Sequence, residues 1–302
     1  MKNNTLQVGI VGVGRFGTRH LEKWLQIKDA AVCGFYDIDP VVGKRVEEQY
    51  NIPLLSQDDL IACSAVIDIV VPASSHYSVA KAALQAGKHV FIEKPFAETP
   101  EQARELCSLA RVNGGIVGIG YIERFNPVYS ALRSHLSEVP EYIEAYRQGP
   151  FLPGVGVDVS IILELMIHDI DMVCQLIPYP LRSVSANGER IHTGKIDRAS
   201  AELIFENGSK VMLHASRAET GRRREMICLD KGKKIVADFM ECRLHLNGKD
   251  PLTFGKYDAM LDELGSFTKA VRENRPHHIN ERDGLIAVEI AAAIENSIKI
   301  NT

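Results

Sequence analysis

The sequence has little of several features that define other classes of protein. None of its apolar runs reaches the roughly 18 residues of a membrane-spanning helix, because Asp68 interrupts one run and Glu164 and His168 interrupt another. The opening residues also lack the basic, apolar and small-residue regions of a signal peptide. We therefore expect a cytoplasmic protein without a membrane partner.

Excess charge and paired cysteines are also missing. The 35 Lys and Arg residues against 39 Asp and Glu residues give a net charge of -4, which supplies no general field to attract nucleic acid. The six cysteines are scattered and include no CxxC pair, which argues against a disulfide framework and a zinc cluster. We expect reduced cysteines and no nucleic-acid partner.

The first part of the chain carries apolar runs that alternate with amphipathic segments. The runs between residue 6 and about residue 121 are LQVGIV, AAVCGFY, AVIDIVV, KHVFIE and GIVGIG. They are apolar throughout, as strands covered on both faces should be, and the segments between them suit crossover helices. The pattern predicts an α/β N-terminal Rossmann fold with a doubly wound parallel sheet.

The pattern changes after residue 122. The segment SAELIFENGSKVMLHAS alternates apolar and polar residues around Asn207-Gly208, a favourable hairpin turn. Residues 160–176 and 284–300 have the pattern of helices. We expect an α+β C-terminal domain with an open, mostly antiparallel sheet, and place the domains at 1–121 and 122–302. Further turns are expected at Lys231-Gly232 and Asn247-Gly248.

The first strand leads into the motif GVGRFG, which places Gly12, Gly14 and Gly17 as GxGxxG and then opens a helix. Such glycines permit a tight turn and close approach to a pyrophosphate, and the helix N-terminus presents free N–H groups to it. The motif, with Arg15 and Phe16 inside it, predicts a dinucleotide site. The alternative is a glycine turn that binds nothing.

Asp37 ends the second strand, 20 residues after Gly17. An acidic residue there can accept hydrogen bonds from the adenosine ribose hydroxyls and would repel a 2′-phosphate. We therefore expect NAD, with NADP as the second candidate. The alternative is that Asp37 merely starts the turn, while Asp39 caps the next helix.

The segment VVPASSHYSVAKAALQAGKHVFIEKP resembles the Gfo/Idh/MocA oxidoreductase family. The resemblance, which extends over essentially the whole chain, implies an NAD(P)-dependent dehydrogenase acting on CH–OH groups, with Lys94 as a catalytic residue. Independently, a lysine at the carboxyl end of a parallel strand lies where ligands bind in such sheets. The alternative is a surface lysine paired with Glu93. The resemblance also places four residues at the cofactor: Pro72, His76, Glu93 and Lys94.

The second domain carries ELMIHDIDMV, in which Glu164, His168 and Asp171 lie at i, i+4 and i+7 on one face of a helix, while Asp169 points elsewhere. The family pattern has Asp, His and Asp at the three shared-face positions. By resemblance His168 is catalytic, the first acid supports it or Lys94, and Asp171 contacts substrate; Glu164 departs from the pattern. The alternatives are a buried, satisfied histidine and a metal site, and we expect no metal because hydride transfer needs none.

The segments YIERFNP and RQGPF most resemble the bacterial nucleotide-sugar branch of the family. This likeness implies transfer of hydride from a sugar hydroxyl carbon, C3 of a UDP-N-acetylhexosamine, to give a keto sugar. The basic candidates for a diphosphate are Arg124, Arg147, Arg217 and the run Arg222-Arg223-Arg224. The alternative for the run is a solvated loop or hairpin end. The expected substrate-binding residues are Tyr121, Arg124, Asn126, Arg147 and Asp171.

Two other functions stay open at this point. One is a free-sugar, inositol or amino-sugar dehydrogenase or reductase of the same family. The other is a non-catalytic NAD-dependent sensor or regulatory protein, as some relatives with this fold are. The family resemblance also implies a homo-oligomer formed through the C-terminal sheet.

Overall fold

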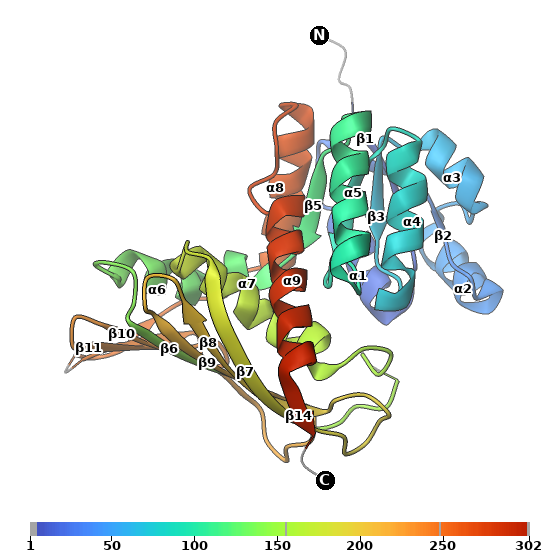
Figure 1. Ribbon diagram of the computed structural model, residues 1–302. Coiled ribbons are helices and arrows are strands. Elements are labelled where there is room, and N and C mark those ends of the chain that lie inside the picture. The colour runs from blue at the N-terminus through green and yellow to red at the C-terminus, as the bar shows by residue number, and fades with distance from the viewer. Residues whose placement is uncertain (1–4, 155, 248, 301–302) are drawn as a thin grey trace. The chain divides into compact units, whose positions relative to one another are not determined.

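The computed structural model describes residues 5–154, 156–247 and 249–300, which fall into two compact units (Figure 1). The first unit contains the chain up to Gly120 and the later segment Asp258–Leu285. The second contains Tyr121–Tyr257 and the chain from Ile286 onward. The division therefore differs from the single boundary expected after residue 121, because Asp258–Leu285 returns to the N-terminal unit.

The first unit is built on a five-stranded parallel sheet of order β2-β1-β3-β4-β5. The strands are β1 (Leu6–Val11), β2 (Ala30–Tyr36), β3 (Val66–Ile69), β4 (His89–Glu93) and β5 (Val117–Gly120). The expected doubly wound parallel sheet is confirmed. The strand order reverses beside β1, and ligands of such sheets bind outside the carboxyl ends of the strands at this reversal.

Helices lie on both faces of this sheet (Figure 1). Helices α1 and α8 contact each other, as do α4 and α5. Polar caps start several of the helices: Asp39 caps α2, Ser56 caps α3 and Thr99 caps α5. The helices are α1 (Arg15–Trp24), α2 (Pro40–Tyr50), α3 (Gln57–Cys63), α4 (Ala73–Gln85), α5 (Pro100–Asn113) and α8 (Ala259–Arg272).

Aromatic packing holds α8 in the first unit. The ring of Phe267 meets the ring of Phe91 on β4 edge-on, with centroids 5.4 Å apart. Gly118 on β5 leaves room for this ring, since a Cβ there would lie 2.5 Å from Phe267. The amphipathic pattern of α8 predicts a buried face but not which sheet buries it.

The second unit contains a nine-stranded sheet of order β13-β12-β11-β10-β6-β9-β8-β7-β14. Its pairs are antiparallel except β6 with β9 and β7 with β14, so the expected mostly antiparallel sheet is confirmed. Asn207-Gly208 joins β8 to β9 and Lys231-Gly232 joins β10 to β11, whereas Gly248 lies outside the described residues. The strands are β6 (Tyr142–Gln148), β7 (Leu181–Glu189), β8 (Arg198–Phe205), β9 (Lys210–Ser216), β10 (Arg223–Asp230), β11 (Lys233–Asp238), β12 (Arg243–Leu246), β13 (Leu252–Thr253) and β14 (Ile298–Ile300).

The helical segments depart from expectation in two places. The helix expected over 160–176 begins with a π-helical turn, Ile162–Met166, before α7 (Ile167–Leu176). The helix expected to end at residue 300 is α9 (Glu281–Ser297), and its last expected residues instead form β14, which pairs with β7. The remaining helices are a 3-10 turn (Ile122–Phe125) and α6 (Pro127–His135).

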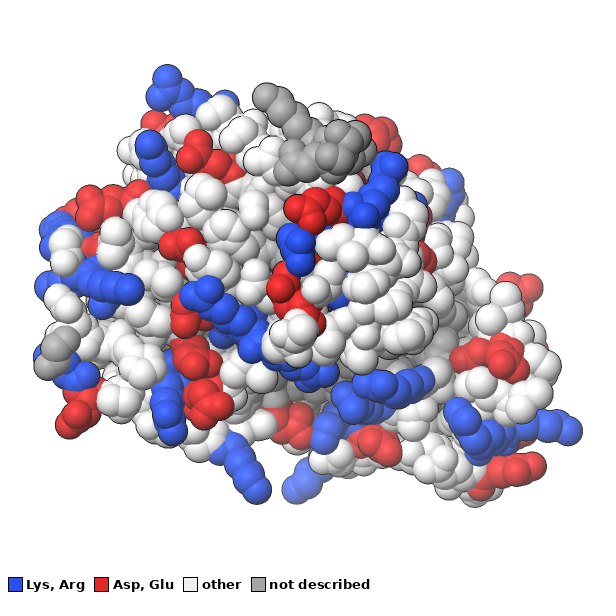
Figure 2. Space-filling model, turned by 90° about the horizontal axis from the view of Figure 1, so that it is seen from below, with Lys and Arg blue, Asp and Glu red and all other residues white. Residues whose placement is uncertain are grey.

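The surface mixes charges of both signs, and Figure 2 shows Lys and Arg side chains interspersed with Asp and Glu. Within the described ranges, no helix is long and apolar enough to cross a membrane. The same residues contain no group of three or more His, Cys, Asp or Glu side chains arranged to hold a metal ion.

Candidate active site

The glycine turn after β1 is shaped for close approach by a ligand. Gly12 has φ +90° and Gly17 packs against it, so a Cβ at Gly17 would lie 1.9 Å from the Gly12 carbonyl oxygen. Gly14 is the N-cap of α1 and meets nothing within 4 Å on its Cβ side. The turn therefore has a tightly packed base and an open rim, which fits a pyrophosphate at the helix N-terminus. Arg15 and Phe16 follow on that rim, both exposed.

Asp37 follows β2 directly and supports the glycine turn. Its Oδ2 accepts a hydrogen bond from the Val13 N–H at 2.8 Å, and its Oδ1 accepts one from the Asp39 N–H at 2.9 Å. Asp39 in turn caps α2. A carboxylate has about four acceptor sites, so the half-exposed Asp37 keeps capacity for ribose hydroxyls.

A buried cluster of ionisable groups lies beneath the carboxyl end of β4. The His20 ring on α1 is fully buried, with Nδ1 3.0 Å from Asp68 Oδ2 and Nε2 3.2 Å from Glu93 Oε1. Trp24 donates its indole N–H to the same Asp68 oxygen at 2.7 Å. Glu93 is thus held from below, and its Oε2 accepts the backbone N–H of Lys94 at 3.2 Å.

The two carboxylates decide the protonation of His20. Burial alone lowers the pKa of a histidine, but the charge and hydrogen bond of Asp68, with those of Glu93, outweigh it and raise the pKa of His20 to about 10. His20 is therefore a buried cation at neutral pH. It allows Asp68 on β3 and Glu93, which ends β4 directly before Lys94, to stay buried.

Other residues of the first unit hold the turn that contains Lys94 and Pro95. The half-buried Lys94 is joined to Pro95 by a cis peptide bond. His76 is buried, with Nδ1 2.7 Å from the Pro95 carbonyl oxygen and Nε2 2.9 Å from that of Val71, and burial lowers its pKa. These contacts position the turn, and the expected contact of His76 with the cofactor stays a prediction. The exposed Pro72 is the N-cap of α4.

In the second unit, Glu164 and His168 are both half-buried. Glu164 lies within the π-helical turn, and His168 lies in the first turn of α7 that follows it. The Ile167 N–H bonds back to the Ile162 carbonyl, a five-residue step that widens the turn. The expected alignment of Glu164 with His168 assumed regular α-helical spacing, which this turn does not have. Glu164 instead packs over Gly156, where a Cβ would lie 2.4 Å from the carboxyl carbon.

A half-buried arginine, Arg124, and a buried one, Arg147, are paired with acids of α7. Arg124 binds Asp171 through both Nε, at 2.8 Å, and Nη2. Arg147 binds both oxygens of Asp169, at 3.0 and 2.9 Å, and Glu123 at 2.7 Å. Burial lowers the pKa of Arg147, but the two carboxylates outweigh it and raise the pKa.

These pairings indicate structural roles for two residues whose expected contact with substrate stays a prediction. Arg147, 2% exposed, has its guanidinium bound to two carboxylates, so we interpret it as a residue that positions α7. Asn126 caps α6 through its side-chain oxygen and donates to Glu123 at 3.2 Å, which also indicates positioning. Tyr121 is fully buried. Its contact with substrate, like that of Arg124 and Asp171, stays a prediction.

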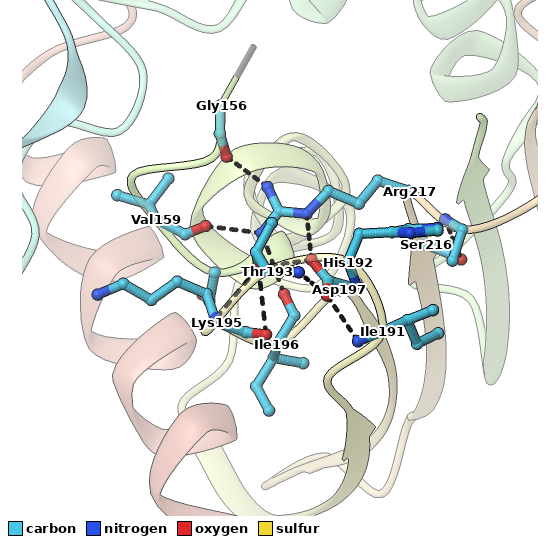
Figure 3. Close-up of polar contacts among 12 residues, drawn as sticks. Gly156, Val159, Ile191, His192, Thr193, Lys195, Ile196, Asp197, Ser216 and Arg217 are labelled. Atoms are coloured by element: carbon cyan, nitrogen blue, oxygen red, sulfur yellow. Dashed lines mark hydrogen bonds and ion pairs between the residues drawn. The ribbon is translucent and has the colours of Figure 1, made fainter. Parts of the chain in front are cut away.

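A third pair, the buried Asp197 with the buried Arg217, holds the surrounding loops together (Figure 3). Arg217 binds Asp197 Oδ1 through Nε at 2.8 Å and donates through Nη2 to the Val159 carbonyl at 2.9 Å and through Nη1 to the Gly156 carbonyl. Asp197 Oδ2 accepts three backbone N–H groups, at 2.7 to 2.9 Å. Arg217, expected near a diphosphate, therefore holds loop 156–159 under Glu164.

Sequence reasoning missed His20, Asp68 and Asp197. Asp68 gave a signal, because a charged residue in an otherwise apolar buried strand needs a partner. His20 shares the inward face of α1 with Leu21 and Trp24, which made it a candidate for that partner. Asp197 lies in a polar loop and gave no such signal.

Comparison with known proteins agrees with this geometry. A family model described as oxidoreductase family, NAD-binding Rossmann fold matches residues 6–121, and one described as GFO/IDH/MocA C-terminal domain matches residues 154–234. The chain is 32% identical to the UDP-N-acetylglucosamine 3-dehydrogenase of Acidithiobacillus ferrooxidans, with 90% of each chain covered. A solved structure of that dehydrogenase superposes with a TM-score of 0.91 at 30% identity, covering 97% of both chains.

More distant relatives include dehydrogenases named for inositols. The chain is 24% identical to the myo-inositol 2-dehydrogenase of Thermotoga maritima, over 97% of this chain and 96% of that one. The scyllo-inositol dehydrogenase of Lactobacillus casei, solved with NAD(H) and scyllo-inositol, shares the fold, with a TM-score of 0.83, 21% identity and 97% of both chains covered.

The fold and the glycine turn define an NAD-binding oxidoreductase of the Rossmann type. Within that class, the chain belongs to the Gfo/Idh/MocA family. It is an NAD-dependent dehydrogenase of the group that acts on sugar hydroxyls.

Proposed function

We propose that the protein oxidises C3 of a UDP-N-acetylhexosamine to a keto sugar. The observation that carries this substrate is the likeness to the UDP-N-acetylglucosamine 3-dehydrogenase, with 32% identity over 90% of the chain and a TM-score of 0.91. NAD, when bound at the glycine turn, supplies the hydride acceptor. Asp37, where a 2′-phosphate would be repelled, supports NAD over NADP.

Lys94 is assigned to take the hydroxyl proton. It lies at the carboxyl end of β4, where ligands of parallel sheets bind, and its backbone N–H is held by Glu93 over the buried His20. Proton transfer of this kind depends on a base held in place. The support from Glu93 therefore suits Lys94 to the role.

His168 and Glu164 are assigned to the substrate half, with His168 binding the reacting sugar hydroxyl and Glu164 orienting it. The packing of Glu164 over Gly156, and of Gly156 against Arg217, supports an orienting role for Glu164. Arg124 is assigned to the substrate together with Asp171. Their bidentate pairing fixes the guanidinium plane that would meet a ligand oxygen.

The test is turnover with UDP-N-acetylglucosamine and NAD, followed through the near-ultraviolet absorbance of the reduced cofactor. An aminotransferase with glutamate removes the keto product and draws the reaction forward. We expect reduced cofactor with the wild type, and at least a hundredfold lower rate with Lys94→Ala because general base catalysis contributes about 10² to 10⁴. Lys81→Ala is the matched control, since Lys81 forms an exposed ion pair with Glu105.

Turnover with inositols but not with the nucleotide sugar would contradict the proposed substrate. That second candidate is supported by the likeness to the inositol 2-dehydrogenase of Thermotoga maritima. NAD binding by calorimetry without turnover of any sugar would instead favour a sensor.

A homo-oligomer formed through the nine-stranded sheet is part of the same proposal. Figure 1 shows α6 and α7 on one face of this sheet. Tyr146 and His214, stacked with ring centroids 4.7 Å apart, belong to the alternating half-exposed set on the strands. Light scattering on the purified protein tests this proposal, and a monomer at micromolar concentration would contradict it. A cytoplasmic location, where reduced cysteines persist, is also proposed.

A further inference from the structure

Two cysteines of the first unit lie with their sulfur atoms in contact. Cys33 is on β2 and Cys63 is the last residue of α3, and their Sγ atoms are 3.0 Å apart. Both belong to the same compact unit. The pair is separate from the glycine turn and from the turn around Lys94.

The backbone, and not a flexible side chain, places the Cys33 sulfur. In the β1–β2 ladder Val8 pairs with Val32 and Gly9 pairs with Gly34, so Cys33 is the extra residue of a β-bulge. A bulge redirects the side chain of its extra residue, and bulges are rare between parallel strands. This irregularity therefore sets the direction of the Cys33 thiol.

The end of α3 approaches closely on the same side. A Cβ at Gly9 would lie 2.3 Å from the Ser64 Oγ and 2.8 Å from Leu60. Glycine at this position thus permits the end of the helix to pack on β1. The bulge and the glycine together place the two sulfurs.

The two thiols have different surroundings. Cys63 is exposed, whereas Cys33 is half-buried with its Sγ 3.3 Å from the Ser64 Oγ and 3.5 Å from the Val8 carbonyl. Burial, and then the contact with Cys63, raises the pKa of Cys33 to about 11. An oxidant in solution reaches Cys63 first, and Cys33 is placed to react second.

We propose that Cys33 and Cys63 form a reversible disulfide when the protein meets a peroxide. The Cys63 sulfur attacks one peroxide oxygen, the O–O bond breaks, and Cys63 becomes a sulfenic acid while one water is released. The Cys33 sulfur then attacks the Cys63 sulfur, and the S–O bond breaks. The leaving hydroxide takes the Cys33 proton as a second water, so two thiols are oxidised and one peroxide is reduced.

Little movement is needed for this step. A disulfide has an S–S bond of about 2.0 Å, so the sulfurs must approach by roughly one ångström. The closed bond would fasten α3 to β2 four residues before Asp37. The proposal does not depend on the identity of the sugar substrate.

The experiment treats the full-length protein with hydrogen peroxide, blocks remaining thiols and maps the peptides by mass spectrometry without reduction. We expect a cross-linked pair of peptides containing Cys33 and Cys63, which disappears after dithiothreitol. Cys63→Ser should leave Cys33 as a free thiol, and Cys33→Ser should leave a Cys63 sulfenic acid that dimedone traps. Cys242→Ser, in the second unit, should leave the cross-link unchanged.

Oxidation of Cys63 to a sulfinic acid while Cys33 stays free, or cross-links that join other cysteines first, would overturn the proposal. A second measurement needs no variant, because Trp24 is the single tryptophan and lies in the first unit. Its fluorescence should report an unfolding temperature several degrees higher after oxidation, restored by dithiothreitol, since the bond closes a loop of about 30 residues. An unchanged or lower temperature would show that the site is not preset for closure.

Discussion

Removing the carboxylate of Asp197 should unfold the second unit at markedly lower denaturant. The side chain is fully buried. Its Oδ2 atom accepts hydrogen bonds from the backbone N–H groups of Ile191, His192 and Thr193. Its Oδ1 atom accepts one from the Arg217 guanidinium at 2.8 Å. Asp197→Ala leaves all of these donors without their acceptor. One substitution therefore removes the acceptor of several buried hydrogen bonds at once.

The expected magnitude follows from the burial of the partner. Arg217 is 5% exposed, and breaking a buried ion pair by removing one partner costs about 3–5 kcal/mol. Asp197→Asn should also destabilise, by about 1–3 kcal/mol, because its NH₂ group must face either the three N–H donors or the guanidinium. The matched control is Glu189→Gln in the half-exposed pair with Arg198, where we expect a change below about 1 kcal/mol.

The pH dependence has a defined sign. Burial raises the pKa of Asp197, but the backbone N–H groups of Thr193 and Ile191 and the other donors outweigh it and lower the pKa. A lowered pKa contributes stability that is present above the ordinary value of about 3.9 and is lost as pH falls below it. The difference between the wild type and Asp197→Ala should therefore shrink at acidic pH.

Urea unfolding followed by far-ultraviolet circular dichroism measures these differences. Hydrogen exchange by mass spectrometry adds a local readout, because residues 191–193 should lose protection in Asp197→Ala. Equal unfolding midpoints for Asp197→Ala and Glu189→Gln, with unchanged exchange of residues 191–193, would refute the reasoning.

Three further predictions concern the first unit. Gly17→Ala should weaken NAD binding at least about tenfold, or 1.4 kcal/mol, because its Cβ would lie 1.9 Å from the Gly12 carbonyl oxygen; unchanged affinity by calorimetry would contradict this. Asp37→Ser should shift the ratio of the Kd values for NAD and NADP toward NADP by about tenfold, since repulsion of a 2′-phosphate is lost, and an unmoved ratio would count against the assigned role. His20→Gln should destabilise by about 3–5 kcal/mol at neutral pH, because Asp68 loses its cation. The raised pKa of His20, about 10, provides stability that is complete below the ordinary value of about 6.5 and is lost as pH rises toward 10, so the wild type should lose this advantage over the variant between pH 7 and 10 in urea titrations.

The first unit could be predicted from sequence because its signals are local. Continuous apolar runs indicate covered parallel strands, and the spacing of Gly12, Gly14 and Gly17 follows from contacts within a single turn. All five strands lie where the runs placed them, to within a few residues. Signals within single strands and a single turn were therefore enough to predict the parallel sheet and the NAD cofactor.

The contents of the second unit depended on distant pairings that leave no local trace. The charge of Arg147 predicts a diphosphate ligand, but in the structure its guanidinium is bound by the carboxylates of Asp169 and Glu123. The π-helical turn at Ile162–Met166 changes the number of residues per helical turn, and the periodicity of so few residues does not reveal this change. Helix α8 returned to the first unit because Phe267 fits beside Gly118, a match between residues about 150 positions apart.

The hydrogen bonds of Arg217 bear on which amino-acid substitutions the surrounding loops can accept. Its guanidinium bonds to the carbonyl groups of Gly156, Val159 and Ile196, and not to their side chains. The half-exposed side chain at 196 can therefore be replaced without removing any of these bonds, whereas Val159, 2% exposed, also packs in the core. Loops that are held by their main chain keep their backbone course while their exposed side chains change, which gives selection, or a designer, freedom to alter this surface of the second unit.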